Sequence, residues 1–218
     1  MKLATVATTV MMMILGLTVP AQAENPTHLK QLLETNNCPK CDLSGAELAG
    51  VNLQGADLRD ANLQGANLQG ANLNEVNFNR AALTEANLER ANLIAAKLHG
   101  ANLERANLSY SNLSLAGLVI ASLNHANLSH ANLIGANLES ADLTGANLKN
   151  AQQSVANLGE VRLKEGSLYG FDISGVNLRD ADLTGANLTG ANLTASDLAG
   201  ATLENATMIN ANLMNIRR

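Results

Sequence analysis

Residues 61–73 read Ala61-Asn62-Leu63-Gln64-Gly65, Ala66-Asn67-Leu68-Gln69-Gly70, Ala71-Asn72-Leu73, and the rest of the chain repeats this pattern. A leucine or a substitute for it stands at position 43 and at every fifth position as far as 213, which makes 35 five-residue units. Leucine fills 31 of these central positions. The residue two before the centre is alanine in 26 units, and the residue just before it is asparagine in 19 and aspartate in 6. Because the spacing never slips, one local structure must repeat along the chain.

A period of five is incompatible with one long helix or one long strand. Five residues of α-helix advance about 500°, so successive leucines would lie about 140° apart and form no apolar stripe. Side chains in a strand alternate between two faces, so an odd period would send successive leucines to opposite sides. The period fits a short extended segment followed by a turn, with glycine as the second turn residue in 13 units, where a positive φ favours it. Every leucine then points inward around a coil, which predicts a solenoid.

The units resemble those of the pentapeptide-repeat family, whose motif is written A(D/N)LXX. The resemblance covers residues 41–215, about four-fifths of the chain. It implies an all-β fold, a right-handed quadrilateral β-helix with four units in each coil. Neither the number four nor the handedness follows from the spacing. With four units to a coil, residues 20 apart stack on the same face.

Residues 1–23 have the pattern of a secretory signal peptide. Lys2 supplies the positive start, residues 10–19 a short apolar region, and Ala21-Gln22-Ala23 an A-x-A cleavage site. We therefore expect an exported protein, in the periplasm or thylakoid lumen, with no stable membrane insertion after cleavage; the alternative is an uncleaved anchor. Beyond the leader, 13 basic and 19 acidic residues leave a net charge of −6, which argues against nonspecific binding to nucleic acid.

Residues 24–40 predict a cap and linker in front of the first coil. Asn25 is a favourable N-cap residue, and Pro26 suits the first position of a helix. Leu29, Leu32 and Leu33 would share one face of that helix. Because the first coil of a solenoid otherwise exposes its leucines and its backbone edge, we expect this short helix to cover it. At the other end, residues 216–218 form a short tail with no helix to cover the last coil.

Cys38 and Cys41 form a Cys-x-x-Cys pair where the cap meets the first unit. In an exported protein we expect them to form a disulfide that locks the cap to the first coil. A thioredoxin-like redox site, a zinc site and two free thiols are the alternatives, although no βαβ unit surrounds the pair and no Cys or His cluster supplies two further zinc ligands. The opening Cys-x-x-Cys-Asp-Leu-Ser-Gly is also similar to that of exported or lumenal members of the pentapeptide-repeat family.

Residues 151–175 depart from the pattern. Gln153 puts an amide where a leucine belongs, and Val161, Gly166 and Phe171 replace alanine. An unpaired buried amide costs about 1–3 kcal/mol, so we expect a local bulge near Gln153, with Phe171 of the next coil filling the gap. The segment is either a recognition loop or sequence variation that a redundant core tolerates.

Outward residues sorted by face predict one apolar and one acidic side. The apolar residues recur in successive coils around the face of Leu53 and its neighbouring corner, and contiguous apolar patches mark partner surfaces. The predicted partner surface is Ile94, Leu115, Val119, Ile120, Ile134 and Val155. The alternative is a set of isolated apolar side chains, which are ordinary on protein surfaces. The face of Leu43 carries Asp42, Glu85, Glu104, Asp142, Glu165, Asp182 and Glu204 against Arg105, Arg162 and Lys164.

The residues predict no catalytic, cofactor-binding or metal-binding site. His125 and His130 sit at neighbouring corners of one predicted coil, but no carboxylate in that coil completes a metal site. No His–Asp pair is placed to activate a serine or threonine, and the glycines form no phosphate-binding loop. We therefore predict a protein that is not an enzyme.

The sequence favours a non-enzymatic structural or protein-interaction rod with an unidentified protein partner and no nucleic-acid partner. The competing function is that of family members that mimic duplex DNA and bind type II topoisomerases, which share the rod and an acidic surface. The signal peptide directs this chain away from the cytoplasm, where those enzymes act. Family members pair end to end through the C-terminal coil, so the resemblance also implies a homodimer there. Arg217 and Arg218 would repel each other across the two-fold axis unless they reach carboxylates such as Glu204.

Overall fold

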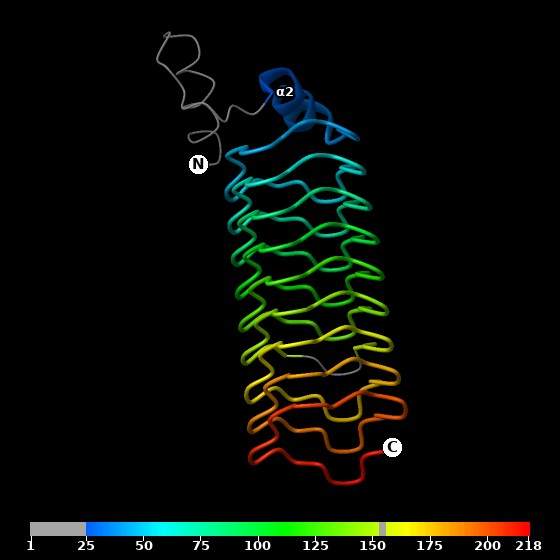
Figure 1. Ribbon diagram of the computed structural model, residues 1–218. Coiled ribbons are helices and arrows are strands. Elements are labelled where there is room, and N and C mark those ends of the chain that lie inside the picture. The colour runs from blue at the N-terminus through cyan, green and yellow to red at the C-terminus, as the bar shows by residue number, and fades with distance from the viewer. Residues whose placement is uncertain (1–24, 153–155) are drawn as a thin grey trace.

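The computed structural model describes residues 25–152 and 156–218, which form one rod of stacked coils (Figure 1). Parallel bridges join each residue that precedes a central position to the residue 20 positions later, for example Asn67 to Asn87 and Asn87 to Asn107. A spacing of 20 residues means four units in each coil. The fold is therefore the right-handed quadrilateral β-helix that the resemblance implied.

Backbone hydrogen bonds run from coil to coil in every regular unit. In the unit centred on Leu63, the Leu63 N–H donates to the Ala82 carbonyl at 2.7 Å and the Gly65 N–H to the Thr84 carbonyl at 2.9 Å. A third type of bond closes the turn, where the Ala66 N–H donates to the Leu63 carbonyl at 3.0 Å. The walls of the rod are built from these isolated bridges because each extended segment ends at a corner after about three residues.

The second turn residue has a left-handed backbone in every described unit. Glycines take this conformation, as the sequence predicted, but so do charged, aromatic and branched residues, including Leu115 at φ 60° and Ile120 at φ 52°. The left-handed conformation costs a non-glycine residue about 1–2 kcal/mol. The stacking of the coils therefore imposes the turn, whichever residue occupies it.

The asparagine or aspartate before each centre links both neighbouring units and neighbouring coils. Within a unit its side-chain oxygen accepts a bond from the backbone N–H two residues later, as Asn62 Oδ1 does from Gln64 at 3.2 Å. Between coils the amides bond to one another, as where Asn107 Nδ2 donates to Asn87 Oδ1 at 3.4 Å and Asn127 Nδ2 donates to Asn107 Oδ1 at 3.3 Å. A short polar side chain with an acceptor oxygen suits this position, which explains the preference in the repeat.

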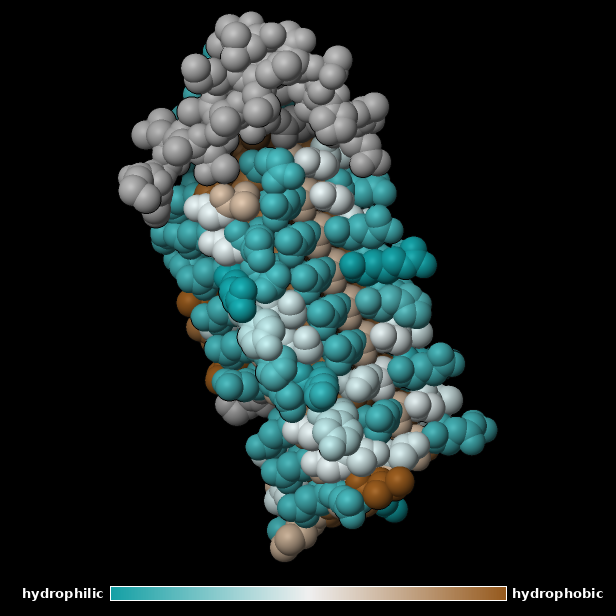
Figure 2. All heavy atoms as spheres, turned by 90° about the vertical axis from the view of Figure 1, so that its left-hand side faces the viewer, coloured by the Kyte–Doolittle hydropathy of each residue, from teal (hydrophilic) through white to brown (hydrophobic). Residues whose placement is uncertain are grey.

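The four faces of the rod are numbered here by their central residues, which recur at intervals of 20. Face 1 contains Leu43, face 2 Leu48, face 3 Leu53 and face 4 Leu58. Outward side chains of successive coils form columns along the rod, mostly hydrophilic on the side that Figure 2 shows. A row is the set of outward residues that one coil places across one face.

The core is a single column of leucines and alanines inside the coils. Central leucines such as Leu63 and Leu128 are fully buried, and so are the aromatic substitutes Phe78 and Phe171. Gln153, where the sequence predicted a bulge, lies outside the described residues. On both sides of it the spacing of 20 is kept, with Asn147 bridged to Ser167 and Gln152 to Asp172, so the coil register is not shifted there.

The predicted cap is present as helix α2, Pro26–Thr35, at the N-terminal end of the rod (Figure 1). The Asn25 side chain accepts bonds from the backbone N–H groups of Thr27 and His28 at 3.1 and 3.3 Å, so Asn25 is the N-cap and Pro26 the first helical residue. Leu29 and Leu32 are buried against the first coil. The helix ends because Asn36 adopts a left-handed conformation, at φ 56°.

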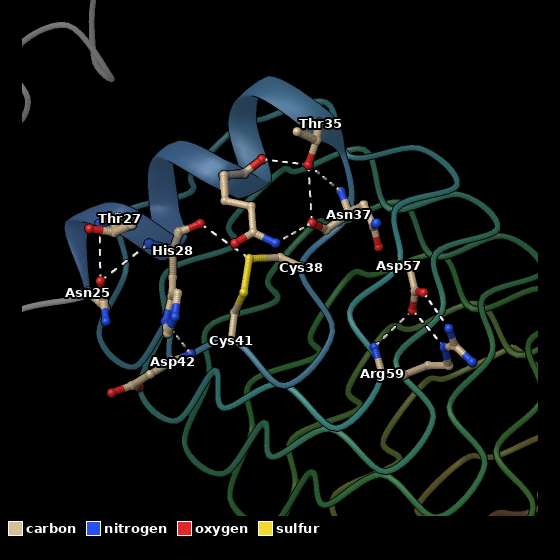
Figure 3. Close-up of a disulfide and its surroundings, with 11 residues drawn as sticks. Asn25, Thr27, His28, Thr35, Asn37, Cys38, Cys41, Asp42, Asp57 and Arg59 are labelled. Carbon is tan, nitrogen blue, oxygen red and sulfur yellow. Dashed lines mark hydrogen bonds and ion pairs between the residues drawn. A yellow bond between two sulfur atoms is a disulfide. The ribbon is translucent and has the colours of Figure 1, made fainter.

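Cys38 and Cys41 form the predicted disulfide, with an S–S distance of 2.02 Å, beneath α2 (Figure 3). The coil pattern begins one unit earlier than the sequence pattern indicated, because Asn37 bridges to Asp57 and Cys38 occupies a central, inward position. The disulfide rules out zinc ligation and free thiols. Both cysteines are buried, which also argues against a redox-active pair, since thiol–disulfide exchange requires access to a sulfur atom.

The two ends of the rod differ in how their core is covered. The first coil is covered by α2, and the His28 ring of α2 accepts a bond from the Asp42 N–H at 3.0 Å. In the last coil, Leu203, Met208 and Leu213 are only partly buried. Among the described residues, no helix is long and apolar enough to cross a membrane.

Candidate protein-binding surface

The structure divides the predicted partner surface between two faces. Ile94 and Ile134 lie on face 3, and Leu115 lies between their levels at the corner that joins face 3 to face 4. The Leu115 N–H donates to the Ile134 carbonyl at 2.9 Å, so these two residues are neighbours in adjacent coils. Val119 and Ile120 lie on face 4 and its far corner. Val155 lies outside the described residues.

The aliphatic border of face 3 is open to solvent. Leu115 is 65% exposed and Ile134 38%, while Ile94 is half-buried. A methyl placed on Gly135 would come within 2.9 Å of Leu115 Cδ2, so the Leu115 side chain lies flat across the neighbouring coil. Three aliphatic residues in three successive coils thus form a low ridge along one border of face 3.

An aromatic and cationic stack forms the opposite border of face 3. The rings of Tyr110 and His130 are parallel, with centroids 4.7 Å apart, and the Arg90 guanidinium lies 5.4 Å from the Tyr110 centroid on the preceding coil. Tyr110 is 53% exposed. The sequence interpretation missed this stack, although the intervals of 20 between Arg90, Tyr110 and His130 are visible once the coil length is known.

Asparagines occupy the floor of face 3 between these borders. Asn112 accepts a bond from the Ser114 hydroxyl at 2.7 Å. The side-chain oxygen of Asn92 is buried and has no hydrogen-bond partner, because the Ile94 N–H donates instead to Asn74 Oδ1 at 3.2 Å. Face 3 therefore combines an aliphatic border, an aromatic border and a polar floor over the coils of residues 90–134.

A model of the family named Pentapeptide repeats matches the chain in eight copies, which lie within residues 41–116, 121–152 and 156–215. These ranges make up more than half of the chain and coincide with the coils. The chain belongs to the pentapeptide repeat family. No curated protein sequence matches this pentapeptide repeat protein significantly.

Solved structures of other pentapeptide repeat proteins resemble the rod. HetL, a protein involved in heterocyst differentiation regulation from the cyanobacterium Nostoc sp. strain PCC 7120, is 29% identical, with a TM-score of 0.52 over 89% of this chain and 94% of its own. QnrB1, a plasmid-mediated fluoroquinolone resistance protein, is 16% identical, with a TM-score of 0.46 over 77% and 89%. A thylakoid lumen protein from Arabidopsis thaliana is 29% identical, with a TM-score of 0.23 over 44% and 66%.

The acidic side of this pentapeptide repeat protein, face 1, is locally balanced by its bases. Arg162 lies 3.0 Å from Asp142, Lys164 lies 3.4 Å from Asp182, and Arg105 also pairs with a neighbouring carboxylate, at 3.5 Å. Burial raises the pKa of Asp142, but hydrogen bonds from Thr144 and the charge of Arg162 outweigh it and hold the pKa below its usual value. The face therefore lacks a continuous strip of unpaired carboxylates.

The two histidines that the sequence placed at neighbouring corners are engaged separately. His130 stacks on Tyr110, and the His125 ring lies over Gly145 of the next coil, where a methyl would collide with it. In residues 25–152 and 156–218, no group of three or more His, Cys, Asp or Glu side chains is placed to hold a metal ion.

The open C-terminal coil is the site of the homodimer that the family resemblance implied. Its partly exposed core residues and uncovered backbone edge are surfaces that proteins usually cover or pair. Arg217 lies 3.6 Å from Asp197 of its own chain, which reduces the expected repulsion between copies. End-to-end pairing stays a prediction, which sedimentation of the protein with and without Arg217 and Arg218 would test.

Proposed function

We propose that this protein is an exported, non-enzymatic rod that binds another protein through face 3. Export is supported by residues 1–23, with their basic start, apolar stretch and A-x-A site. Binding without catalysis is supported by membership of a family of repeat rods and by the flat, solvent-exposed character of the surface. A rigid β-helix presents such a surface to a partner with little loss of conformational entropy.

The observation that carries this proposal is the exposed ridge of Ile94, Leu115 and Ile134 facing the Tyr110 stack. Large apolar side chains usually avoid solvent, and contiguous exposed patches mark protein interaction sites. Leu115 is in addition held in a left-handed backbone, which favours glycine or asparagine on energetic grounds. An exposed leucine at such a position is costly for the fold and is explained by a role in binding.

The competing function, mimicry of duplex DNA, has less support. Duplex DNA presents a regular array of phosphates, about one charge per 1.7 Å of its axis. On face 1 of this rod, three carboxylates are paired with bases, and the whole chain carries a net charge of only −5.

A site-specific photo-crosslinker at Ser114 tests the binding proposal in intact cells. Ser114 lies on face 3 between Tyr110 and Leu115, and its hydroxyl donates to Asn112 at 2.7 Å. Thr194 is the matched control, because it occupies the same column and its hydroxyl donates to Asn192 at 2.6 Å, but it lies beyond the apolar ridge.

The expected result is a discrete crosslinked species of higher mass from position 114 and none from position 194. Ile94→Asp together with Ile134→Asp should abolish it. Equal crosslinking at 114 and 194, or crosslinking that survives the double substitution, would contradict the proposal. Fractionation of the same cells tests export, since the species should be found in the exported compartment with the leader removed.

A further inference from the structure

Face 4 carries an apolar row that extends from one corner of the rod to the other. In one coil, the outward residues across this face are Leu115, Gly117, Val119 and Ile120. Leu115 and Ile120 are 65% and 54% exposed. Ile120 Cδ1 would lie 3.9 Å from a methyl on Gly100, so this side chain also lies along the face instead of projecting from it. The row is therefore flat, apolar and uncovered.

The charges on either side of this row have opposite signs. The preceding coil places Lys97 and His99 on face 4, and the following coil places Glu139 in the same column as His99. One coil further out in each direction, Arg80 and Glu160 share a column. Face 4 is thus basic toward the N-terminal end, apolar in the middle and acidic toward the C-terminal end.

These charges are largely unused within the chain. Lys97, His99, Glu139 and Glu160 form no ion pair with any described residue of the chain, and Glu139 and Glu160 accept hydrogen bonds only from neutral groups, at 3.3 and 3.2 Å. Arg80 differs, because its guanidinium binds Asp60 at 2.7 and 2.9 Å. Exposed charges of opposite sign, arranged symmetrically about an apolar centre, are the pattern of a self-complementary interface.

We propose that face 4 binds face 4 of a second copy of this protein, with the two rods antiparallel. A two-fold axis that lies in the interface and runs along the apolar row exchanges the rows above and below it. His99 of one copy then faces Glu139 of the other, and Arg80 faces Glu160. Each contact occurs twice, and Val119 and Ile120 pack against their own equivalents.

A depression on face 4 supports the pairing of Arg80 with the acidic half. It has a volume of about 200 Å³ and is lined by residues that include Glu139, Gly159, Glu160 and Asp180. Gly159 opens this depression because it has no side chain to fill the surface. In the antiparallel dimer, the long Arg80 side chain of the second copy lies over this acidic depression.

The alternative orientation and the outer coils were compared in the same way. Parallel rods would bring equal levels together and set the basic halves against each other, which is unfavourable. In the antiparallel dimer the outermost charges, Arg59 and Asp60, face Arg179 and Asp180, where each charge has an opposite charge on the diagonal. The charge pattern therefore selects the antiparallel arrangement.

Analytical ultracentrifugation of the full protein and of charge-reversal variants tests this dimer. Glu160→Arg should raise the dimer dissociation constant more than about tenfold, because the substitution sets two arginines against each other at both symmetry-related contacts. The double variant Arg80→Glu with Glu160→Arg should restore dimerisation, since the exchanged charges are again complementary. Val119→Asp, at the axis, should abolish dimerisation.

Glu165→Arg is the matched control. Glu165 is an exposed glutamate in the same turn position as Glu160, with a similar φ of 54°, but it lies on face 1 and should have no effect. A monomer at all concentrations, or a dimer that Glu160→Arg and Val119→Asp leave intact, would overturn the proposal; the latter result is expected of an end-to-end dimer. The face 3 variant Ile94→Asp with Ile134→Asp should leave the dimer unchanged, so this proposal and the binding proposal can fail separately.

Discussion

The left-handed turns lead to a prediction in which one substitution has opposite effects at two positions. Ala95 occupies the second turn position with φ 54°, whereas Ala106 lies two residues before a central leucine, without a positive φ, and is fully buried. Replacing each by glycine removes the same methyl group. The structure predicts that Ala95→Gly stabilises the rod and that Ala106→Gly destabilises it.

The magnitudes follow from the two environments. At Ala95, glycine relieves a backbone cost of about 1–2 kcal/mol but adds about 0.5–1 kcal/mol of chain entropy in the unfolded state, so the net gain is about 0.5–1 kcal/mol. At Ala106, the same entropy term adds to the loss of a buried methyl, about 0.8 kcal/mol, so the net cost is about 1.5 kcal/mol.

Urea unfolding followed by far-ultraviolet circular dichroism measures both effects as shifts of the midpoint, in opposite directions, at an unchanged slope. Gly175→Ala is the reverse control, because a methyl there would meet no atom within 4 Å and yet its φ of 67° should make it destabilising. If Ala95→Gly lowered the midpoint as much as Ala106→Gly, the turn would not be strained and this reasoning would be refuted.

Three further predictions concern the core, the disulfide and acid stability. Leu128→Ala should cost about 2–5 kcal/mol in urea unfolding, while Leu213→Ala in the open last coil should cost clearly less; equal losses would contradict a solenoid with one uncovered end. Because Cys38 is fully buried, a small thiol reductant should reduce the disulfide far more slowly in the native protein than in urea, as mass spectrometry would show, whereas equal rates would indicate an accessible redox pair. The folded pKa of Asp142 lies below its unfolded value of about 3.9, so Asp142 stabilises the fold above that pH and loses this contribution as the pH falls through the folded pKa. Asp142→Asn should therefore narrow its stability difference from the unmodified protein at acid pH, and a pH-independent difference would exclude this linkage.

The period of the sequence predicted the inward leucines, and the Asn25–Pro26 pair predicted α2, because both signals are local. The number of units in a coil depends on the turn angles, which side-chain spacing does not encode, so it came from the family resemblance. Cys38 was not recognised as a central residue, since Asn36-Asn37-Cys38-Pro39-Lys40 lacks both alanine and leucine.

The candidate surfaces were only partly predictable. Once 20 residues make a coil, the levels of Ile94, Leu115 and Ile134 follow from their numbers. The stacking of Tyr110 on His130, and the flat course of Leu115 over Gly135, depend on side-chain torsions that no spacing reveals. Left-handed turns at leucine and isoleucine were also unexpected, because the preference for glycine at this position suggests a local requirement, whereas the neighbouring coils supply the constraint.

The constant register of 20 residues determines how this gene can change in length. Duplication of 20 residues lengthens the rod by one storey and leaves every column intact, because all bridges reconnect at the same interval. Loss or gain of a single pentapeptide also preserves the core, but it rotates everything downstream by a quarter turn. Such an event within residues 96–114 would move Leu115 and Ile120 out of line with Ile94, leaving a folded protein whose surfaces no longer match their partners. Selection on binding should therefore act on the phase of insertions and deletions, and selection on folding only on their multiples of five.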